Sequence, residues 1–332
     1  MSHCPGIVPP YIVSNIEGQL ELDEAIRRRR ASSPVVRGTQ GAETTTANPQ
    51  RSIYDARNAE DLPGTLVRSE GSAAGSDVAV NEAYDGLGAT FAFYWDVFSR
   101  NSIDGNGLPL LGTVHYGQDY DNAFWDGERM IFGDGDGTYF NRFTISVDVI
   151  GHELTHGVTG AEVNLDYEGQ SGALNESVSD VFGSLVKQYA ASETAAAADW
   201  LIGEGLFTSR VSGAALRSMK APGTAYADPV LGTDPQPDSM SGYVDTDEDN
   251  GGVHINSGIP NRAFYLVATG LGGSSWEKAG PIWYATISSS SLSASASFAE
   301  FAAETVASAG SLYDASVAAV VTSAWQTVGV SV

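Results

Sequence analysis

The sequence predicts an α+β protein with a β-rich N-terminal part and an α-helical C-terminal part. Residues 51–146 contain short apolar runs and aromatic clusters separated by Asp-Gly pairs, which is typical of strands joined by tight turns, with at least one helix among them. From Val147 onward, apolar residues recur at helical spacing instead. The chain has 332 residues, of which 42% are hydrophobic, and this is enough apolar material for a large buried core.

The first 50 residues are expected to form a separate module. A Pro-Pro-Tyr turn at residues 9–11 precedes a helix-like segment from about Glu17, which ends in the four arginines 27–30. Residues 31–50 are rich in Ser, Thr, Gly and Pro and lack periodicity, so they are predicted to be a linker. We therefore divide the chain into a prosegment-like module with its linker (1–50), a β-rich lobe (51–150) and a helical lobe (151–332).

In the C-terminal part, helical periodicity covers residues 147–159, 172–191, 257–269, 276–309 and 311–326. The fourth of these stretches contains a run of low complexity, residues 288–297, made mainly of Ser and Ala. Because Phe298 and Phe301 follow this run, we expect it to stay in a folded helical context rather than to act as a linker.

The charge balance limits the classes of partner. A net charge of −24 argues against nucleic acid or an anionic membrane as the main partner, because both require a basic face. No apolar stretch of about 18 residues occurs, and the N-terminus lacks the basic start and apolar run of a signal peptide. The one cysteine, Cys4, excludes an internal disulfide, so stability is expected to come from packing and bound metal.

The strongest chemical motif is the run His152-Glu153-Leu154-Thr155-His156, within the first predicted helix of the C-terminal part. On a helix, residues four apart share a face, so both imidazoles can reach one ion while Glu153 lies on the next ridge. This run is the known signature of zinc proteases. Taken alone, it leaves open a plain helix with two histidines.

A second segment, Asn175 to Asp180, begins 19 residues after His156. Catalytic zinc takes three protein ligands and leaves a fourth position for water, and Glu176 on a neighbouring antiparallel helix can be the third ligand beside His152 and His156. Asp180 and Asn175 could each accept the free N–H of a liganding histidine and so fix its tautomer. The two segments together predict a zinc site.

With these segments the chain resembles the thermolysin family of neutral zinc metalloproteases, from about Arg51 to the C-terminus. The likeness also rests on residues 122–127 (Asn-Ala-Phe-Trp-Asp-Gly), residues 133–137 (Gly-Asp-Gly-Asp-Gly) and residues 249–258. The Pro-Pro-Tyr motif is similar to that of the protealysin-like branch, whose prosegments are short. The resemblance implies a two-lobe α+β fold in which the zinc helix forms the floor of the cleft between the lobes.

The resemblance also implies roles for the catalytic residues. Glu153 would be the general base that takes a proton from zinc-bound water, whose pKa zinc lowers toward about 7. His254 and Tyr167 would donate hydrogen bonds to the developing oxyanion, and Asp249 would orient the His254 imidazole. The implied activity is that of a zinc-dependent neutral endopeptidase.

Substrate binding follows from the same resemblance. Arg217 would hold the carbonyl of the residue after the scissile bond, and Asn122 with the Ala123 backbone would form the edge along which substrate lies. The main specificity pocket is expected to prefer Leu, Phe or Ile just after the cut bond, and the residues that would line it are Phe140, Phe143, Val149 and Leu216.

One calcium site of the family is altered in this sequence. Asp148, Asp199 and Glu204 match positions of a double calcium site, but Lys187 and Leu201 stand where two further carboxylates are expected. A lysine ammonium among three carboxylates neutralises the charge that calcium would otherwise neutralise. We therefore expect an internal ion cluster in place of the double calcium site.

The N-terminal module resembles the short inhibitory prosegment of the family and would act as an intramolecular inhibitor by occluding the cleft. A sharper alternative places Cys4 or His3 on the open zinc position of the precursor, because thiolate and imidazole are both good zinc ligands. The processing point is expected between roughly Arg30 and Arg51.

Two competing functions can be compared with the residues that each would require. A catalytically inactive zinc-binding scaffold that captures peptides would require the loss of Glu153, Tyr167 or His254, and all three are present. An aminopeptidase would show a Gly-x-Met-Glu-Asn run, which does not occur.

Protein and peptide substrates are the expected partners. The resemblance implies an extracellular protein, and since no signal peptide is visible, a cytoplasmic location or an unconventional export route is the alternative.

Overall fold

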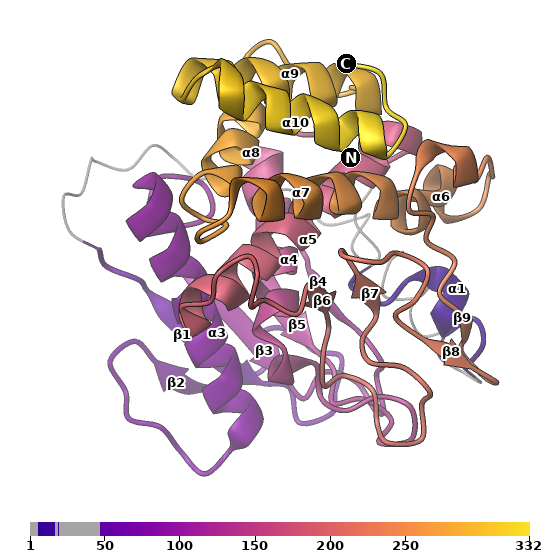
Figure 1. The fold of residues 1–332 in the computed structure, drawn as a ribbon. Helices are drawn as coiled ribbons and strands as arrows, with labels where there is room; N and C mark the ends of the chain where they lie inside the picture. Colours follow the sequence, from indigo (N-terminus) through magenta and orange to yellow (C-terminus); the bar gives the residue numbers. More distant parts are fainter. Residues whose placement is uncertain (1–5, 17–18, 20–46) are drawn as a thin grey trace.

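The computed structural model describes residues 6–16, residue 19 and residues 47–332. The expectations for His3 and Cys4, for the helix-like segment ending at residues 27–30 and for most of the linker lie outside the described residues. In the described chain a sheet-bearing lobe and a helical lobe meet along two central helices (Figure 1). This arrangement confirms the predicted α+β class.

The N-terminal lobe is built on a five-stranded sheet with the strand order β2-β1-β3-β5-β4. Strand β3 pairs in parallel with β1 and β5, whereas β2 and β4 pair antiparallel with their neighbours. The strands are β1 (Arg51–Asp55), β2 (Thr65–Ser69), β3 (Leu110–Val114), β4 (Ala123–Trp125) and β5 (Arg129–Phe132). Because β4 is an edge strand, one side of its backbone is available to pair with another segment.

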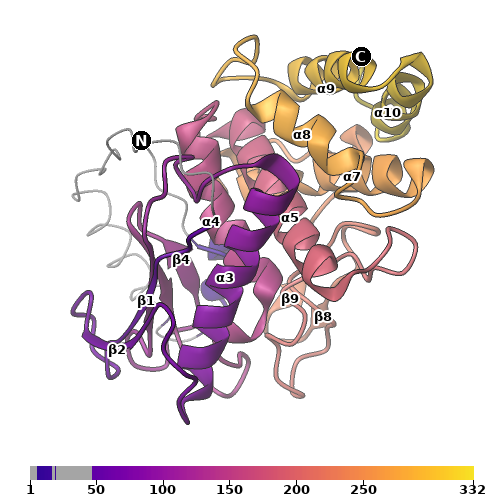
Figure 2. The same cartoon turned by 90° about the vertical axis from the view of Figure 1, so that its left-hand side faces the viewer.

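One long helix, α3 (Val78–Phe98), lies along the sheet of this lobe (Figure 2). It begins at Asp77, whose side chain accepts a hydrogen bond from the Val80 N–H. Its apolar face, which includes Leu87, Phe91 and Phe93, is buried in the main core. Helix α3 also packs against α4, so it connects the sheet to the centre of the molecule.

The two central helices are α4 (Val147–Ala161) and α5 (Gly169–Ala191), and they pack closely along their length. A Cβ atom added at Gly183 of α5 would lie 2.4 Å from the Asp148 carbonyl oxygen and 3.0 Å from the His152 amide nitrogen of α4. Only glycine fits at this crossing. The close approach brings the side chains of the second motif segment next to those of the first.

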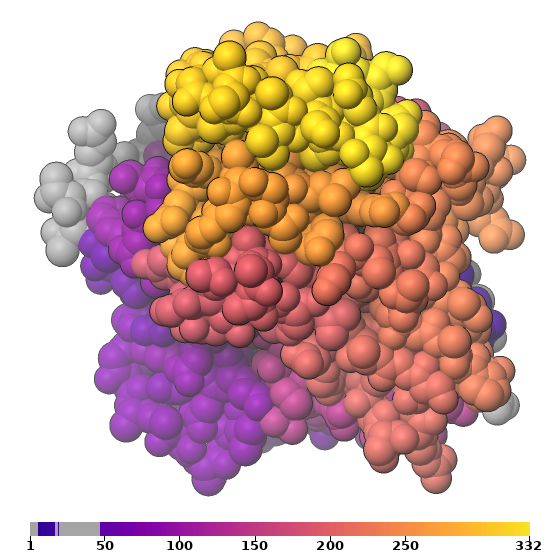
Figure 3. All heavy atoms as spheres, in the orientation of Figure 1, coloured from indigo at the N-terminus to yellow at the C-terminus, as the bar shows by residue number. Residues whose placement is uncertain are grey.

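The C-terminal lobe adds helices around α5 and buries an aromatic core. In this core the rings of Trp283 and Trp325 stack at 6.1 Å, and those of Phe264 and Phe301 lie edge-on to Trp283. In Figure 3, α9 and α10 (yellow) form the face farthest from the sheet lobe (purple). The helices are α6 (Asp249–Asn256), α7 (Gly258–Leu271), α8 (Ala279–Ile287), α9 (Phe298–Leu312) and α10 (Ala315–Thr327).

Several short elements complete the fold. The two-stranded sheets are β6 (Leu201–Ile202) with β7 (Arg217–Ser218), and β8 (Ala227–Asp228) with β9 (Gly232–Thr233). Single 3-10 turns cover Phe143–Ile145 and Met240–Gly242. The one described helix of the N-terminal segment is α1 (Pro10–Val13), whose Ile12 and Val13 are buried in the main core.

The expectation for residues 276–309 is wrong in one respect. This stretch forms two helices, α8 and α9, and residues 288–297 between them are not helical. The serine hydroxyls explain the break, because Ser289 and Ser293 accept hydrogen bonds from the amides two residues further on and so stabilise turns. Helix α9 then starts afresh with a capping box formed by Ser297 and Glu300.

Candidate active site

Helices α4 and α5 bring three metal-binding side chains together at the centre of the molecule. The Nε2 atoms of His152 and His156 lie 3.1 Å apart. The Glu176 carboxylate lies 3.4 Å from His152 Nε2 and 3.5 Å from His156 Nε2. In the described part of the chain these residues form the one group of three or more His, Cys, Asp and Glu side chains with the geometry to hold a metal ion.

The other ring nitrogen of each histidine is already occupied. His152 Nδ1 lies 2.8 Å from Asp180 Oδ1, and His156 Nδ1 lies 2.8 Å from Asn175 Oδ1 and 3.1 Å from Ser179 Oγ. When both Nδ1 atoms carry the proton, both Nε2 lone pairs face the same point. Two imidazoles and one carboxylate with this orientation match the donor set of catalytic zinc.

Asp180 is surrounded by donors on every side. Each of its two oxygens accepts a hydrogen bond of 2.8 Å from Arg217, and Asn261 Nδ2 donates a further hydrogen bond of 2.8 Å. Burial opposes its charge, but Arg217 and His152 lower the pKa of Asp180 to about 2. The carboxylate therefore stays ionised and holds His152 and Arg217 in fixed positions.

Tyr167 and His254 both contact the Glu176 carboxylate. The Tyr167 hydroxyl donates to Glu176 and lies 3.4 Å from His254 Nε2. Asp249 makes two hydrogen bonds with His254. Its Oδ1 atom lies 2.7 Å from the ring Nδ1, and its Oδ2 atom accepts a bond of 2.8 Å from the backbone N–H. Burial opposes a charge on the ring, but Asp249 and Glu176 raise the pKa of His254 above its ordinary value.

Glu153 is fully buried beside this group. Its Oε2 atom accepts a hydrogen bond of 2.9 Å from the backbone N–H of Trp125, on edge strand β4. Glu153, Tyr167 and His254, the residues that an inactive scaffold would lack, therefore lie together around the candidate metal centre.

The predicted substrate edge is occupied by the N-terminal segment. Ile7 donates its N–H to the Ala123 carbonyl at 3.1 Å, and its own carbonyl accepts from Arg217 Nη1 at 3.1 Å. Val8 binds the Asn122 side chain through both its N–H, at 2.9 Å, and its carbonyl, at 3.3 Å. The residues predicted to bind substrate backbone thus bind this chain's own residues 7 and 8.

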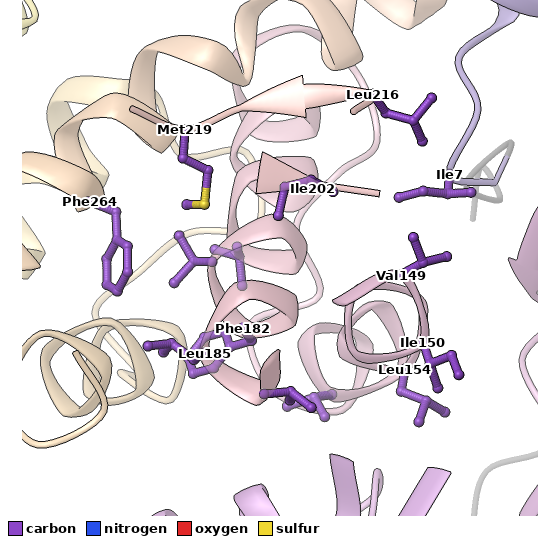
Figure 4. Packing of buried hydrophobic residues seen from close by; sticks show 14 of the residues in the cluster. Ile7, Val149, Ile150, Leu154, Phe182, Leu185, Ile202, Leu216, Met219 and Phe264 are labelled. Atoms are coloured by element: carbon purple, nitrogen blue, oxygen red, sulfur yellow. The ribbon is translucent and has the colours of Figure 1, made fainter. Parts of the chain in front are cut away.

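Two of the predicted pocket residues lie beside the Ile7 side chain. Figure 4 shows Ile7 between Val149 and Leu216, with Ile202 beyond. These side chains, together with Phe140 and Phe143, are buried in the same hydrophobic cluster as Ile7. Ile202 was not among the predicted pocket residues; its place on β6, paired with the strand that carries Arg217, emerges only from the tertiary structure.

Other contacts of the site were also missed by sequence reasoning. Ser179 lies one helical turn from Asn175, so its position within the second motif segment was a usable sign. Asn261 and the Trp125 amide had no such sign, because they come from α7 and β4 and meet the site only through packing. The same holds for Gln19, whose side-chain oxygen accepts from the Asp121 N–H at 3.2 Å.

Lys187 on α5 lies among the three carboxylates for which we expected an ion cluster. Its Nζ atom is 2.7 Å from Asp199, 3.3 Å from Glu204 and 3.5 Å from Asp148. Burial opposes its charge, but Asp148 and Asp199 raise the pKa of Lys187 above its ordinary value. The ammonium is therefore held as a cation at this position.

Family models match almost the whole chain. Residues 34–160 match the thermolysin metallopeptidase catalytic domain, and residues 163–330 match the thermolysin metallopeptidase alpha-helical domain. Among the described helices none has the length and apolar character of a membrane span.

Relatives at high identity carry protease names. An extracellular metalloprotease of Pectobacterium carotovorum is 59% identical over 85% of this chain and 81% of its own length. The protease PrtS of a Photorhabdus strain is 47% identical over 98% of this chain and 92% of its own. Among solved structures, the precursor of protealysin, a metalloproteinase from Serratia proteamaculans, matches with a TM-score of 0.89 at 55% identity, covering 98% of this chain and 99% of that one.

Proposed function

The chain belongs to the thermolysin family of zinc metallopeptidases, and from this membership we propose that it cuts proteins before bulky hydrophobic residues and is made as a precursor inhibited by its own N-terminal segment. That it is a zinc-dependent metalloendopeptidase follows from the family and from the His152, His156 and Glu176 cluster. The observation that supports the finer proposal best is the position of Ile7, bound to Ala123 and Arg217 with its side chain in the apolar pocket.

The positions of the catalytic residues support the roles that we propose for them. When bound by His152, His156 and Glu176, zinc supplies Lewis-acid activation of a water molecule and of the peptide carbonyl. Glu153 would accept the proton of the attacking water and pass it to the leaving amine. The Trp125 N–H that binds Glu153 Oε2 fixes the carboxylate for this task.

Tyr167 and His254 would stabilise the negative charge that develops on the carbonyl oxygen of the scissile peptide bond. The hydroxyl and the imidazole approach the same point from two elements, and Asp249 fixes the direction of the imidazole N–H. Donors that are fixed before the reaction typically contribute about 3–4 kcal/mol each to transition-state stabilisation.

Substrate would bind along β4 with its backbone held by Asn122, Ala123 and Arg217. Arg217 is anchored through its Nε and Nη2 atoms on Asp180, which leaves Nη1 to donate to a peptide carbonyl. A pocket lined by aliphatic and aromatic side chains favours Leu, Ile or Phe after the scissile bond, since burying such a side chain contributes about 1.5–3 kcal/mol.

We further propose that Lys187 replaces calcium at the altered double site and that the mature enzyme acts outside the cell. The three carboxylate contacts of the Lys187 ammonium support the first point. The second is supported by the extracellular metalloprotease of Pectobacterium carotovorum.

A direct test incubates the zinc-loaded full chain with a blocked peptide that contains several Ala-Leu and Ala-Phe bonds. We expect cleavage before Leu or Phe, release of the N-terminal segment, and loss of both on chelation, with all products identified by mass spectrometry. Glu153→Ala should bind zinc and leave both the peptide and its own N-terminal segment intact.

The control separates binding from chemistry. Zinc content of the wild-type and Glu153→Ala proteins is measured in parallel, and equal content assigns the lost activity to Glu153. If the matured protein, with zinc bound, left every peptide bond uncut, the proposal would be wrong and the chain would be a peptide-binding scaffold.

A further inference from the structure

We propose that Gly6 is the residue that keeps the N-terminal segment uncut while it occupies the substrate cleft. Ile7 and Val8 bind as a substrate would, but the backbone of Gly6 has a conformation that a substrate residue with a side chain cannot readily take. This inference rests on the proposed function of Arg217, Asn122 and Ala123 in binding substrate backbone.

The bonds of Ile7 define the register of the segment. Arg217 Nη1 donates to the Ile7 carbonyl, and in the proposed function this contact marks the residue that follows the scissile bond. The Ile7 side chain lies in the apolar pocket that would select that residue (Figure 4). The peptide bond between Gly6 and Ile7 therefore occupies the position of the bond to be cut.

The pairing with β4 continues this register. The Ile7 N–H binds the Ala123 carbonyl, and the two backbone groups of Val8 bind the two ends of the Asn122 amide. A segment bound in this way is a substrate on the C-terminal side of the scissile position, so its protection from cleavage has to come from the other side.

Gly6 differs from a substrate residue in its backbone. Its φ is +105°, a conformation that residues with a side chain rarely adopt. A Cβ atom built there would lie 2.6 Å from the Ala123 carbonyl oxygen and 2.9 Å from Asn122 Oδ1. Both atoms accept hydrogen bonds from the segment, from the Ile7 and Val8 N–H groups, so moving them aside would break the contacts that hold it.

A residue with a side chain before the scissile bond must therefore take a different backbone conformation from that of Gly6. A productive substrate and the N-terminal segment are alike from Ile7 onward and differ at Gly6. Gly6, whose carbonyl belongs to the bond to be cut, then lacks the backbone conformation that positions a substrate residue for attack.

The test is the full-length Gly6→Ala precursor. Alanine excludes the turn, so the segment is expected to follow the substrate path and to be cut between residues 6 and 7. We expect a product that begins at Ile7, identified by mass spectrometry, and an early peptidase activity about tenfold or more above that of the wild-type precursor. Gly71→Ala is the matched control, since Gly71 also has a positive φ of +74° but no neighbour within 4 Å.

Ile7→Asp is a second control, which removes the apolar anchor and should raise activity by weakening docking, without a cut before residue 7. Both segment variants are also made with Glu153→Ala, and their melting curves show whether the catalytic lobes are folded. The inference is overturned if Gly6→Ala is as latent as Gly71→Ala, or if it gains activity without a product that begins at Ile7. A matured wild-type protein that cleaves no peptide would instead refute the proposed function.

Discussion

At the scale of single residues, the cleft depends on buried polar groups that are fixed by neighbours from other parts of the chain. Asp180 stays ionised because Arg217 and His152 lower its pKa against the cost of burial. Asp121, next to Asn122, is in the opposite situation. It is 1% exposed, one of its oxygens accepts the Asp136 N–H at 2.7 Å, and the other has no hydrogen-bond partner among the described residues.

This arrangement makes Asp121 a source of pH-dependent instability. Burial, followed by the nearby Asp136 carboxylate, raises the pKa of Asp121 to about 8 from its ordinary value of 3.8. The folded protein therefore binds more protons than the unfolded chain between about pH 4 and pH 8, and its stability falls as pH rises through this range. We expect Asp121→Asn to raise the melting temperature at pH 8–9 and to change it little near pH 4.

Melting curves of inactive Glu153→Ala protein across this pH range provide the measurement, because self-digestion is then absent. Asp61→Asn, at an exposed position whose carboxylate is not among the charges that shift the pKa of Asp121, is the control and should leave the pH profile unchanged. A profile for Asp121→Asn that runs parallel to that of the parent protein would contradict the assignment.

At the scale of elements, the site exists because α4 and α5 approach each other closely enough to share one metal. The HExxH spacing places His152 and His156 on one face of α4, but Glu176 reaches them only through the crossing at Gly183. Edge strand β4 then contributes two backbone groups. The Trp125 N–H donates a hydrogen bond to Glu153, and the Ala123 carbonyl accepts one from the bound segment.

Gly183→Ala should separate these helices. The new methyl group would lie 2.4 Å from a backbone oxygen of α4, and overpacking of this kind costs about 1–3 kcal/mol of folding free energy. We expect a lower melting temperature together with weaker zinc binding, measured by competition with a chelator of known affinity.

Gly160→Ala in α4 is the matched control, since the new methyl would have only one atom, at 4.0 Å, for a neighbour. Alanine is the better helix former by about 0.5–1 kcal/mol, so this variant should be slightly more stable with unchanged zinc affinity. Equal behaviour of the two glycine variants would rule out the crossing as the cause.

At the scale of the whole molecule, a net charge of −24 makes each buried cation important. Lys187 is the positive centre of a group that joins α4, α5 and the segment of residues 199–204. Arg217 plays the same part nearer the zinc site, where it joins α5 to the bound N-terminal segment. The lobes are thus connected by ion pairs as well as by the common apolar core.

Lys187→Glu should convert this connection into a calcium site. Four carboxylates would then lie where three surround an ammonium, and oxygen ligands of this kind bind calcium. In the presence of a chelator, we expect the variant to have a lower melting temperature than the parent protein. Addition of calcium should then raise the melting temperature of the variant.

The parent protein should show no such calcium dependence, and Lys187→Met, which removes the charge without adding an oxygen ligand, should be destabilised in a calcium-independent way. Calcium bound at Asp148, Asp199 and Glu204 in the unmutated protein would refute the replacement.

Sequence reasoning reached the family, the fold class and the enzymatic activity, and the comparisons confirm all three. It also singled out the side chains that the structure brings together at the candidate metal centre. It failed for residues 288–297, where local hydrogen bonds of serine side chains compete with the helix. Periodicity cannot register that competition, because it counts apolar positions only.

The sequence by itself determined what depends on local spacing: the two histidines on one helix face, the acidic segment that follows, and the Pro-Pro-Tyr motif of the N-terminal segment. Tertiary structure alone decided which distant groups complete the site, namely Asn261, the Trp125 amide, Ile202 and the Gly6 turn against Ala123. The physical reason is that these contacts arise from the packing of separate elements. Where two backbones approach closely, as at Gly183 and Gly6, the sequence shows only that the residue is glycine. It does not show which residue lies against that glycine.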